Sequence, residues 1–478
     1  MTDISAVAKA WAYPAVWLLN RCNLATLCLL IICGCAIAEQ FTHSAGLSTT
    51  VALAWLVFVV LQWQQISRTY KLFAILTPAL AAILLLNGTV DAAVVSNGLD
   101  RAAFFTLFLT SLAVLRESAQ TSSLVRRCGK ILVNQPPARR YMLMAFGSHL
   151  FGIMLNIGAL NVLGSMVQRA TRGGADTQAR HIAAVRRRRM LTATLRGFCG
   201  VPLWAPTSVT MLLVLSAIPQ MRWEEYAPLG LVWTLLFILW GAVLDWLAYP
   251  RPKTAAVTTG NLRQLIPLVC LVALIPGTAY FISDMSGLAL FPTLLMCAPV
   301  IGLIWIWQQY RGQPLSYKAG LLSRRLKRSF PRTFTNQRNE VVLFTTSGFI
   351  GVILIPLINP TAIGALLAQA GIGDAGIMTG FSLIMLACSF IGINAIISVT
   401  LMLGAIQKIP DLSIAPQVQA SVVSITWAVF AGASPFTASL RFISGFSGTS
   451  PLHFGVIWNG WFSVSVLMIM YLTLYMVL

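Results

Sequence analysis

The sequence predicts an all-α polytopic membrane protein, with about eleven transmembrane helices, two opposed re-entrant hairpins and an inverted structural repeat. Three observations predict this fold class. The chain of 478 residues is 57% hydrophobic and 10% charged, with a mean hydropathy of +0.79, far more apolar than a soluble domain. Its Lys and Arg residues stand in short blocks between long apolar runs. Interrupted apolar segments recur in the same order in both halves.

The excess of positive charge indicates the membrane topology of the chain and does not indicate binding to a polyanion. The chain carries 33 Lys and Arg residues against 13 Asp and Glu residues, a net charge of +20. These positive charges mark cytoplasmic loops, so no nucleic acid partner is expected. The nine cysteines lack the paired spacing of a metal site or a disulfide framework, and no cofactor is expected. No cleavable signal is predicted.

Four spans are predicted ahead of the first hairpin. Lys9 and Arg21 precede the first span, and Arg68 and Lys71 lie between the second and third, which predicts a cytoplasmic N-terminus. The four spans cover about 22–38, 50–66, 72–95 and 102–118.

The apolar range 141–167 is predicted to be a re-entrant hairpin. Arg140 precedes it and Arg169 follows it, so both ends carry the residues that mark the cytoplasmic side. Its tip is predicted where Asn156 and Gly158 interrupt the run. Non-helical backbone at membrane depth persists only where it is buried in protein or lines a watery cavity, so this tip is a candidate binding site. An ordinary span that contains an Asn is the alternative.

The next apolar stretch, 190–217, is predicted to be a broken helix. It follows the most basic loop of the chain, 169–196, which is predicted to be cytoplasmic. Pro202 and Pro206 both disrupt helical hydrogen bonding, so two half-helices are expected around them. Intact spans are predicted to follow at about 229–249, 264–282, 289–308 and 340–358.

The same pair of interrupted segments recurs in the second half. The range 376–407 is predicted to be a second hairpin with Asn394 near its tip, and 416–445 a second broken helix. One long span is the alternative for 376–407. A last span, 456–477, is predicted to end outside. The two breaks share a proline with neighbouring hydroxyl residues, namely Pro206, Thr207 and Ser208 in the first and Ser434, Pro435 and Thr437 in the second.

These segments predict four parts of the chain. The first hairpin is expected to open to the cytoplasm and the second to the outside, so the repeats have opposite orientations. Inverted repeats with Gly- and Pro-interrupted segments indicate a secondary transporter with a site at the membrane midplane. The parts are 1–48 (N-terminal segment and first span), 49–250 (first inverted repeat), 251–338 (two spans and a basic cytoplasmic loop) and 339–478 (remainder of the second inverted repeat).

In layout, the chain resembles the ion transporter superfamily and, within it, the divalent anion/sodium symporter branch. The resemblance covers nearly the whole chain. That branch carries Ser-Asn-Thr at each hairpin tip, and the Asn maps here to Asn156 and Asn394, whose neighbours are not hydroxyl residues. The resemblance implies an elevator motion, in which the hairpins and spans 5, 6, 10 and 11 move against the other spans.

The candidate binding residues lie at the hairpin tips and in the breaks. Their amides, hydroxyls and carbonyls can bind a solute or ion, and they can also cap helices or bond freed backbone groups. Arg441 could face an anionic substrate or reach the membrane interface, and His149 could carry a coupling proton or be a hydrogen-bonded packing residue. The candidates for solute or ion binding are Asn156, Gly158, Pro206, Thr207, Ser208, Asn394, Ser434, Pro435, Thr437 and Arg441.

The sequence therefore predicts a secondary active transporter of a small anionic organic solute, coupled to Na⁺ or H⁺, and no enzyme activity. A passive channel or facilitator and a membrane-embedded lipid-handling protein are the alternatives. The expected partners are the solute and membrane lipids, with a homodimer as one option for the assembly. We expect a multi-pass protein of the cell (inner) membrane with a cytoplasmic N-terminus and an external or periplasmic C-terminus.

Two cysteine variants test this topology, in a background whose native cysteines are replaced. Ser316→Cys lies in a loop expected in the cytoplasm and should be shielded from membrane-impermeant thiol reagents in intact cells. Gln220→Cys lies in a turn expected outside and should react. Labelling before and after permeabilisation measures both positions, and the reverse pattern would overturn the predicted orientation.

Overall fold

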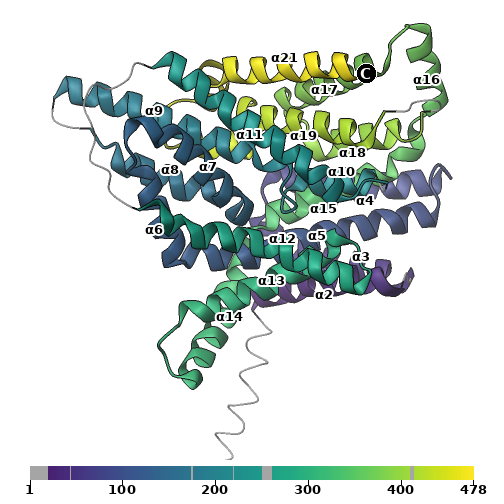
Figure 1. Ribbon diagram of the computed structural model, residues 1–478. Helices are drawn as coiled ribbons and strands as arrows, with labels where there is room; N and C mark the ends of the chain where they lie inside the picture. Colours follow the sequence, from purple (N-terminus) through teal and green to yellow (C-terminus); the bar gives the residue numbers. More distant parts are fainter. Residues whose placement is uncertain (1–19, 43–44, 174–175, 219, 250–260, 410–413) are drawn as a thin grey trace, which may run out of the picture. The chain divides into compact units, whose positions relative to one another are not determined.

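The structure is a computed structural model that describes residues 20–42, 45–173, 176–218, 220–249, 261–409 and 414–478 (Figure 1). All regular elements in these ranges are helices, and ten helical stretches are long and apolar enough to cross a membrane. The chain is therefore an all-α polytopic membrane protein, as the sequence predicts. Lys9, which supported the predicted orientation, lies outside the described ranges.

The chain divides into two compact units. The first unit comprises Met1–Ser118 and Leu295–Ile358, and the second unit comprises Ala119–Leu294 and Asn359–Leu478. Both predicted hairpins and both predicted broken helices fall in the second unit. The predicted four-part division and the membrane orientation of the parts stay predictions.

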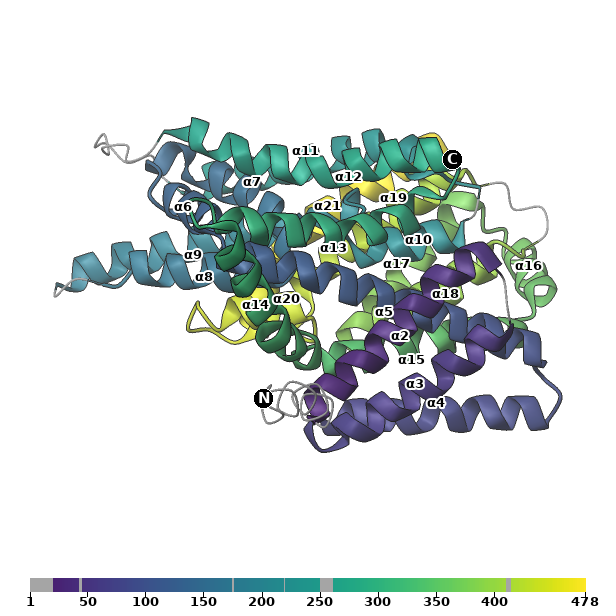
Figure 2. The same ribbon diagram turned by 90° about the horizontal axis from the view of Figure 1, so that it is seen from below.

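The first unit is built from long helices that pack against one another. α2 lies along α3 (Figure 2), and α4 packs against α15. Gly348 lets α15 approach α5, because a Cβ there would lie 2.6 Å from the ring of Phe105. The indole of Trp55 on α3 donates a 2.9 Å hydrogen bond to Thr345 on α15. The bounds are α2 Arg21–Thr42, α3 Ala45–Gln62, η1 Trp63–Gln65, α4 Arg68–Leu86, α5 Ala92–Thr121, α13 Leu290–Gln309, α14 Leu315–Asn336, α15 Arg338–Ile353 and η4 Ile355–Leu357.

The basic segment that follows α13 forms the helix α14. Its apolar side chains Phe330 and Phe334 are buried. Arg325 lies 3.2 Å from a carboxylate oxygen of Glu117, and the hydroxyl of Thr333 donates a 3.1 Å bond to the other oxygen. A paired and hydrogen-bonded carboxylate therefore fixes α14 within the first unit.

The first half of the second unit contains the predicted hairpin as the helices α7 and α8. They are joined by a turn at Asn156 and Ile157, where the sequence predicts the tip. α7 packs closely on α9, because a Cβ at Gly197 would overlap the carbonyl of Ala145. The bounds are α6 Ser123–Val133, α7 Pro137–Leu155, α8 Gly158–Ala170, α9 Thr177–Cys199, η2 Val201–Leu203, α10 Val209–Ala217, α11 Trp223–Ala248, η3 Leu262–Leu265 and α12 Ile266–Ser286.

The first broken helix begins earlier than the predicted range 190–217. α9 starts at Thr177, so the arginines 186–189 lie on a helix and not in a loop. Arg189 makes a two-point ion pair with Asp245 on α11, with distances of 3.0 and 2.6 Å, and this pairing fixes the basic stretch in place. η2 and a turn then separate α9 from α10 at the two prolines, as predicted.

The second half of the second unit repeats this plan. α17 and α18 form the hairpin predicted at 376–407, and α19 and α20 form the broken helix predicted at 416–445. α16 was not predicted, because its apolar stretch is too short to span a membrane. The bounds are α16 Pro360–Gln369, α17 Asp374–Phe390, α18 Ala395–Ile406, α19 Pro416–Ala433, α20 Ala438–Ser444, the π-helix η5 His453–Trp458 and α21 Gly460–Val477.

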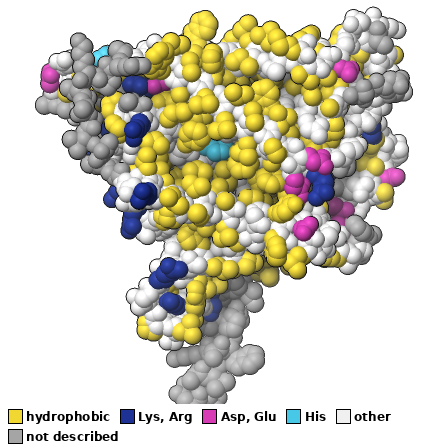
Figure 3. Space-filling model, viewed as in Figure 1, with side chains coloured by type: hydrophobic (Ala, Val, Ile, Leu, Met, Phe, Trp, Pro, Cys, Tyr) yellow, Lys and Arg dark blue, Asp and Glu magenta, His cyan; other side chains and the backbone are white. Residues whose placement is uncertain are grey.

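The two broken helices lie in the interior of the second unit. Every residue of α9 from Met190 to Cys199 is buried, as are nearly all residues of α19. α11 and α12 instead carry hydrophobic side chains on the surface (Figure 3). Such exposed apolar faces on spanning helices are suited to contact with lipid. The first break is therefore enclosed by protein, where irregular backbone can be satisfied, whereas the second break is partly exposed at Pro435, Phe436 and Thr437.

Candidate functional site

The tip of the first hairpin is shaped by Asn156. Its φ of 50° lies in the left-handed region, which costs a non-glycine residue about 1–3 kcal/mol. Its Oδ1 accepts a 2.8 Å hydrogen bond from the backbone N–H of Ile157, a local bond that makes Asn more tolerant of this region than most residues. Within the described ranges, its Nδ2 donates no hydrogen bond. α8 begins directly after the tip, at Gly158.

The first break is held against this hairpin by a hydroxyl group. Thr207 donates a 2.9 Å hydrogen bond to the carbonyl of Ile153, which lies just before the tip. Ser208 caps α10, since its Oγ accepts a 3.2 Å bond from the backbone N–H of Met211. Both hydroxyls therefore satisfy backbone groups around Pro206, the role that the sequence left open beside ion binding.

The tip of the second hairpin is built differently. Gly392, with φ of 84°, makes the left-handed turn, and its Cα faces the ring of Phe436 in the second break. Asn394 has an extended backbone and caps α18, because its Oδ1 accepts a 3.0 Å bond from the N–H of Ile396. Asn394 and Asn156 therefore both bond the start of the following helix, but only Asn156 holds the turn itself.

The second break is tied to its hairpin by the same kind of bond as the first. The hydroxyl of Ser434 donates a 2.8 Å bond to the carbonyl of Ser389 on α17. Thr437 donates to the carbonyl of Ser434 at 2.9 Å and to that of Ala431 at 3.1 Å, both of which precede Pro435. In each repeat, one buried hydroxyl thus joins the break to the hairpin.

The two repeats meet at these breaks. α8 packs against α20 and α10 packs against α18, so the second arm of each hairpin contacts the second part of the other repeat's broken helix. The ends of α9 and α19 touch, because a Cβ on Gly432 would lie 3.3 Å from Sγ of Cys199. Reciprocal contacts of this kind are expected for elements related by a two-fold axis. We call the two tips and two breaks together the hairpin–break site.

His149 is a buried bridge between α7 and the first break. Its Nδ1 lies 3.3 Å from the carbonyl of Gly197, and its Nε2 accepts a 3.0 Å bond from the indole of Trp204. These partners assign the hydrogen to Nδ1 and leave the ring neutral. A second proton on Nε2 would break the bond from Trp204. The hydrogen bonds therefore favour packing over proton transfer as the role of this residue.

The side chain of Arg441 is exposed and contacts the second break, which precedes it in the sequence. Its Nε donates a 3.2 Å bond to the carbonyl of Pro435, and its guanidinium lies 5.9 Å from the centre of the Phe436 ring. Its other N–H groups donate no hydrogen bond to the described part of the chain. The side chain therefore offers a positive charge and free donors beside the break.

Sequence reasoning missed a buried arginine. Arg196 falls in both the predicted basic loop 169–196 and the predicted broken helix 190–217; in the structure it lies in the last turn of α9 and is 6% exposed. It donates to Asn459 Oδ1 at 2.8 Å, to the hydroxyl of Tyr141 at 3.2 Å and to the carbonyl of Gly241 at 3.3 Å. Its guanidinium lies 4.3 Å from the ring centre of Phe462. The run of surface arginines before it hid this signal.

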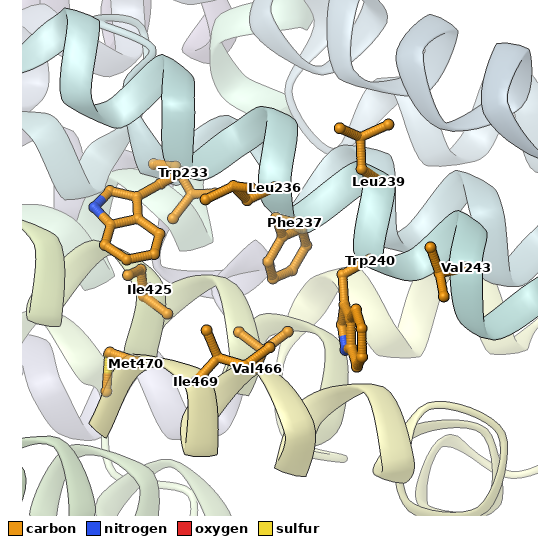
Figure 4. Close-up of a pocket in the computed structure, with 11 residues that line it drawn as sticks. Trp233, Leu236, Phe237, Leu239, Trp240, Val243, Ile425, Val466, Ile469 and Met470 are labelled. Atoms are coloured by element: carbon orange, nitrogen blue, oxygen red, sulfur yellow. The ribbon is translucent and has the colours of Figure 1, made fainter. Parts of the chain in front are cut away.

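An apolar cavity of about 230 Å³ lies between α11 and α21 (Figure 4). Trp233 and Trp240 line it from α11, and Leu203 reaches it from η2. The two indole N–H groups are already bonded to the hydroxyls of Ser421 and Ser465, at 3.2 and 2.7 Å. The cavity therefore offers apolar contacts to an alkyl chain and few polar partners to a small anion.

The described ranges contain no group of three or more His, Cys, Asp or Glu side chains that could hold a metal ion. The absence of a cofactor stays a prediction.

Comparison with known proteins gives distant structural likenesses. No family model matches the chain, and no curated protein matches it. The YdaH transporter of Alcanivorax borkumensis is 13% identical with a TM-score of 0.45, over 77% of this chain and 84% of that one. MtrF of Neisseria gonorrhoeae, described with a class of antimetabolite efflux pumps, is 13% identical with a TM-score of 0.46, over 76% and 80%. Likenesses this distant do not decide the function, and the divalent anion/sodium symporter branch stays a prediction.

The left-handed backbone of Asn156 predicts an unusual order of stabilities. Asn156→Gly should be as stable as the wild type or more stable, because glycine adopts this conformation without strain. Asn156→Ala should be less stable by about 1–2 kcal/mol, because alanine keeps the strain and loses the bond to Ile157. Thermal unfolding in detergent measures both variants. Equal loss of stability in both would show that the amide and not the backbone sets the turn.

Proposed function

We propose that this protein is a secondary active transporter of a small anionic organic solute, coupled to Na⁺ or H⁺. One observation supports this most. The interrupted segments form two matching sets, each tied by one hydroxyl bond, Thr207 to Ile153 and Ser434 to Ser389. Irregular backbone at membrane depth is retained where it is enclosed by protein or lines a cavity. Paired, symmetry-related breaks are the arrangement that secondary transporters use for alternating access.

The groups around the hairpin–break site favour an anion. α8 and α10 both begin at the site, and a helix N-terminus carries about half of a positive charge. The Nδ2 of Asn156 and the guanidinium of Arg441 add hydrogen-bond donors. A carboxylate accepts charge-assisted hydrogen bonds from donors of both kinds. A solute with one or two carboxylates is therefore the best chemical match.

An elevator motion would carry this site as one body. All four interrupted segments belong to the second unit. This unit contains the elements that the family resemblance assigns to the moving body, together with α6, α16 and α12, and α12 is a span that the resemblance assigns to the scaffold. In this proposal the second unit moves against the first and exposes the site alternately on the two sides of the membrane. Matching repeats give the two end states similar energies, as a reversible carrier needs.

The apolar cavity between α11 and α21 favours a second candidate, the handling of lipids. An acyl chain would fill a space lined by Trp233, Trp240 and the aliphatic side chains of α21. Crosslinking to a photoreactive fatty acid, followed by transport of a fluorescent lipid in vesicles, would test it. Transport of the lipid without transport of any small anion would favour this candidate over the first.

Asn394 tests the sign of the solute charge. Asn394→Ser and Asn394→Asp both keep an oxygen that can cap α18, so both should fold. With an anionic solute, the Asp variant should lose more affinity than the Ser variant, because it adds a repelling charge. The loss of a hydrogen bond to a charged group costs about 1.5–3 kcal/mol of binding free energy, which lowers the affinity for the solute roughly 10-fold to 150-fold.

The assay for Asn394 starts from a thermal-shift screen of small organic anions on the wild type. The anion with the largest shift is then used for uptake into proteoliposomes by all three proteins. A control, Asn261→Ser, removes a capping amide from η3 outside the site and should leave uptake unchanged. Equal or better uptake by Asn394→Asp would contradict an anionic solute at this tip.

A variant of His149 tests whether this residue carries a coupling proton. His149→Gln can still donate and accept a hydrogen bond but cannot titrate near neutral pH. Because His149 is a neutral bridge between Gly197 and Trp204, we expect uptake to be unchanged under a Na⁺ gradient alone or a pH gradient alone. Selective loss of pH-driven uptake would instead make His149 the proton carrier.

A further inference from the structure

Two helices end beside each other in the middle of the second unit. α9 ends at Cys199 and α19 at Ala433, and Gly432 packs against Sγ of Cys199. Each helix C-terminus carries about half of a negative charge on its last carbonyls. Two such ends in contact, away from water, create a site of roughly one negative charge in total, which must be balanced by a positive charge.

Arg196 supplies a positive charge at this point. It lies in the last turn of α9, and its Nε donates to Oδ1 of Asn459 at 2.8 Å. The Nδ2 of Asn459 in turn donates a 3.0 Å bond to the carbonyl of Gly432 in the last turn of α19. The guanidinium, which α9 itself carries, is thus linked through Asn459 to the end of α19. Within the described ranges, no carboxylate lies within salt-bridge distance of it.

Several carbonyls near both helix ends already have protein donors. In α9 and just beyond it, the carbonyl of Gly197 faces His149 and that of Gly200 accepts from the hydroxyl of Thr234 at 3.4 Å. In α19, the carbonyl of Ala431 accepts from Thr437 and Ser439, at 3.1 and 2.5 Å. Carbonyl oxygens of broken helices are the usual ligands of a bound Na⁺ in transporters, and here the carbonyls of Gly197, Gly200 and Ala431 already face protein groups.

We propose that the guanidinium of Arg196 is the resident cation at the point where the C-terminal ends of α9 and α19 meet, which we call the helix crossing. The helix crossing then binds no alkali ion, and transport does not use Na⁺ there. This deepens the proposed function, because it removes one of the two coupling ions from the centre of the site. The partners of Arg196 fit this role. Asn459, Tyr141 and Gly241 present three neutral oxygens to it, which are ligands that would also suit a hard metal cation.

The test measures unfolding of the purified full-length protein and needs no transported solute. Thermal midpoints are compared in NaCl and in choline chloride at equal ionic strength, over a series of concentrations. The wild type should show the same midpoint in both salts. Arg196→Ala should have a lower midpoint that rises selectively with Na⁺ or with millimolar guanidinium, because either cation can occupy the three vacated oxygens.

Two matched variants serve as controls. Arg196→Lys keeps the charge and should remain insensitive to Na⁺. Phe462→Leu damages the packing on the guanidinium but keeps the charge, so it should be destabilised equally in both salts. A saturable, Na⁺-specific rise of the wild-type midpoint would overturn the proposal, even if Arg196→Ala does not fold. An Arg196→Ala midpoint that no cation restores would also overturn it.

Because midpoints alone decide this test, its failure is distinct from failure of the proposed function. A protein that transports an anion and is stabilised by Na⁺ would keep the transport function and lose the role of Arg196. A protein that passes the salt test and transports no anion would keep Arg196 as a structural cation in a protein of another function.

Discussion

A helix that stops inside an apolar layer leaves backbone N–H and C=O groups that lipid cannot satisfy, and the second unit is organised around this constraint. In each repeat, the freed groups are bonded by side chains placed within a few residues of the break. Thr207 and Ser434 bond the neighbouring hairpin, and Ser208 and Asn394 cap the helices that resume. Each of these hydrogen bonds contributes about 1 kcal/mol net to stability, whereas a buried polar group left without a partner costs about 1–3 kcal/mol. The fold of the second unit therefore depends on all of these bonds together.

The same constraint explains why each break packs so closely against the helix that follows it. Gly230 packs against the carbonyl of Leu203 after the first broken helix, and Gly455 packs against the carbonyl of Ala433 at the end of the second. A side chain at either position would overlap the backbone of the break. The helices that follow the breaks can therefore cover them and keep lipid away from the irregular backbone. Glycine at Gly230 and Gly455 is thus a requirement of the broken helices themselves.

Most of the helices, turns and breaks could be predicted from local sequence, whereas the buried position of Arg196 could not. Proline and glycine act on their own backbone, so the breaks after Cys199 and Ala433 and the turn at Asn156 were visible without tertiary information. Burial of Arg196 depends on distant partners such as Asn459, and nothing nearby in the sequence separates it from the surface arginines that precede it. Blocks of positive charge are typical of loops in membrane proteins, so the arginine-rich first turns of α9 resemble a loop in sequence.

The buried charge of Arg196 also couples the proposed movement to the membrane potential. Moving one elementary charge across the full potential changes the energy by about 2.3 kcal/mol per 100 mV. A second unit that carries Arg196 together with Arg441 would be driven by voltage, and a bound monovalent anion would cancel one of these two positive charges. The loaded and empty carriers would then respond differently to the same potential. With the inside negative, the empty carrier would rest in whichever position places its cations nearest the cytoplasm.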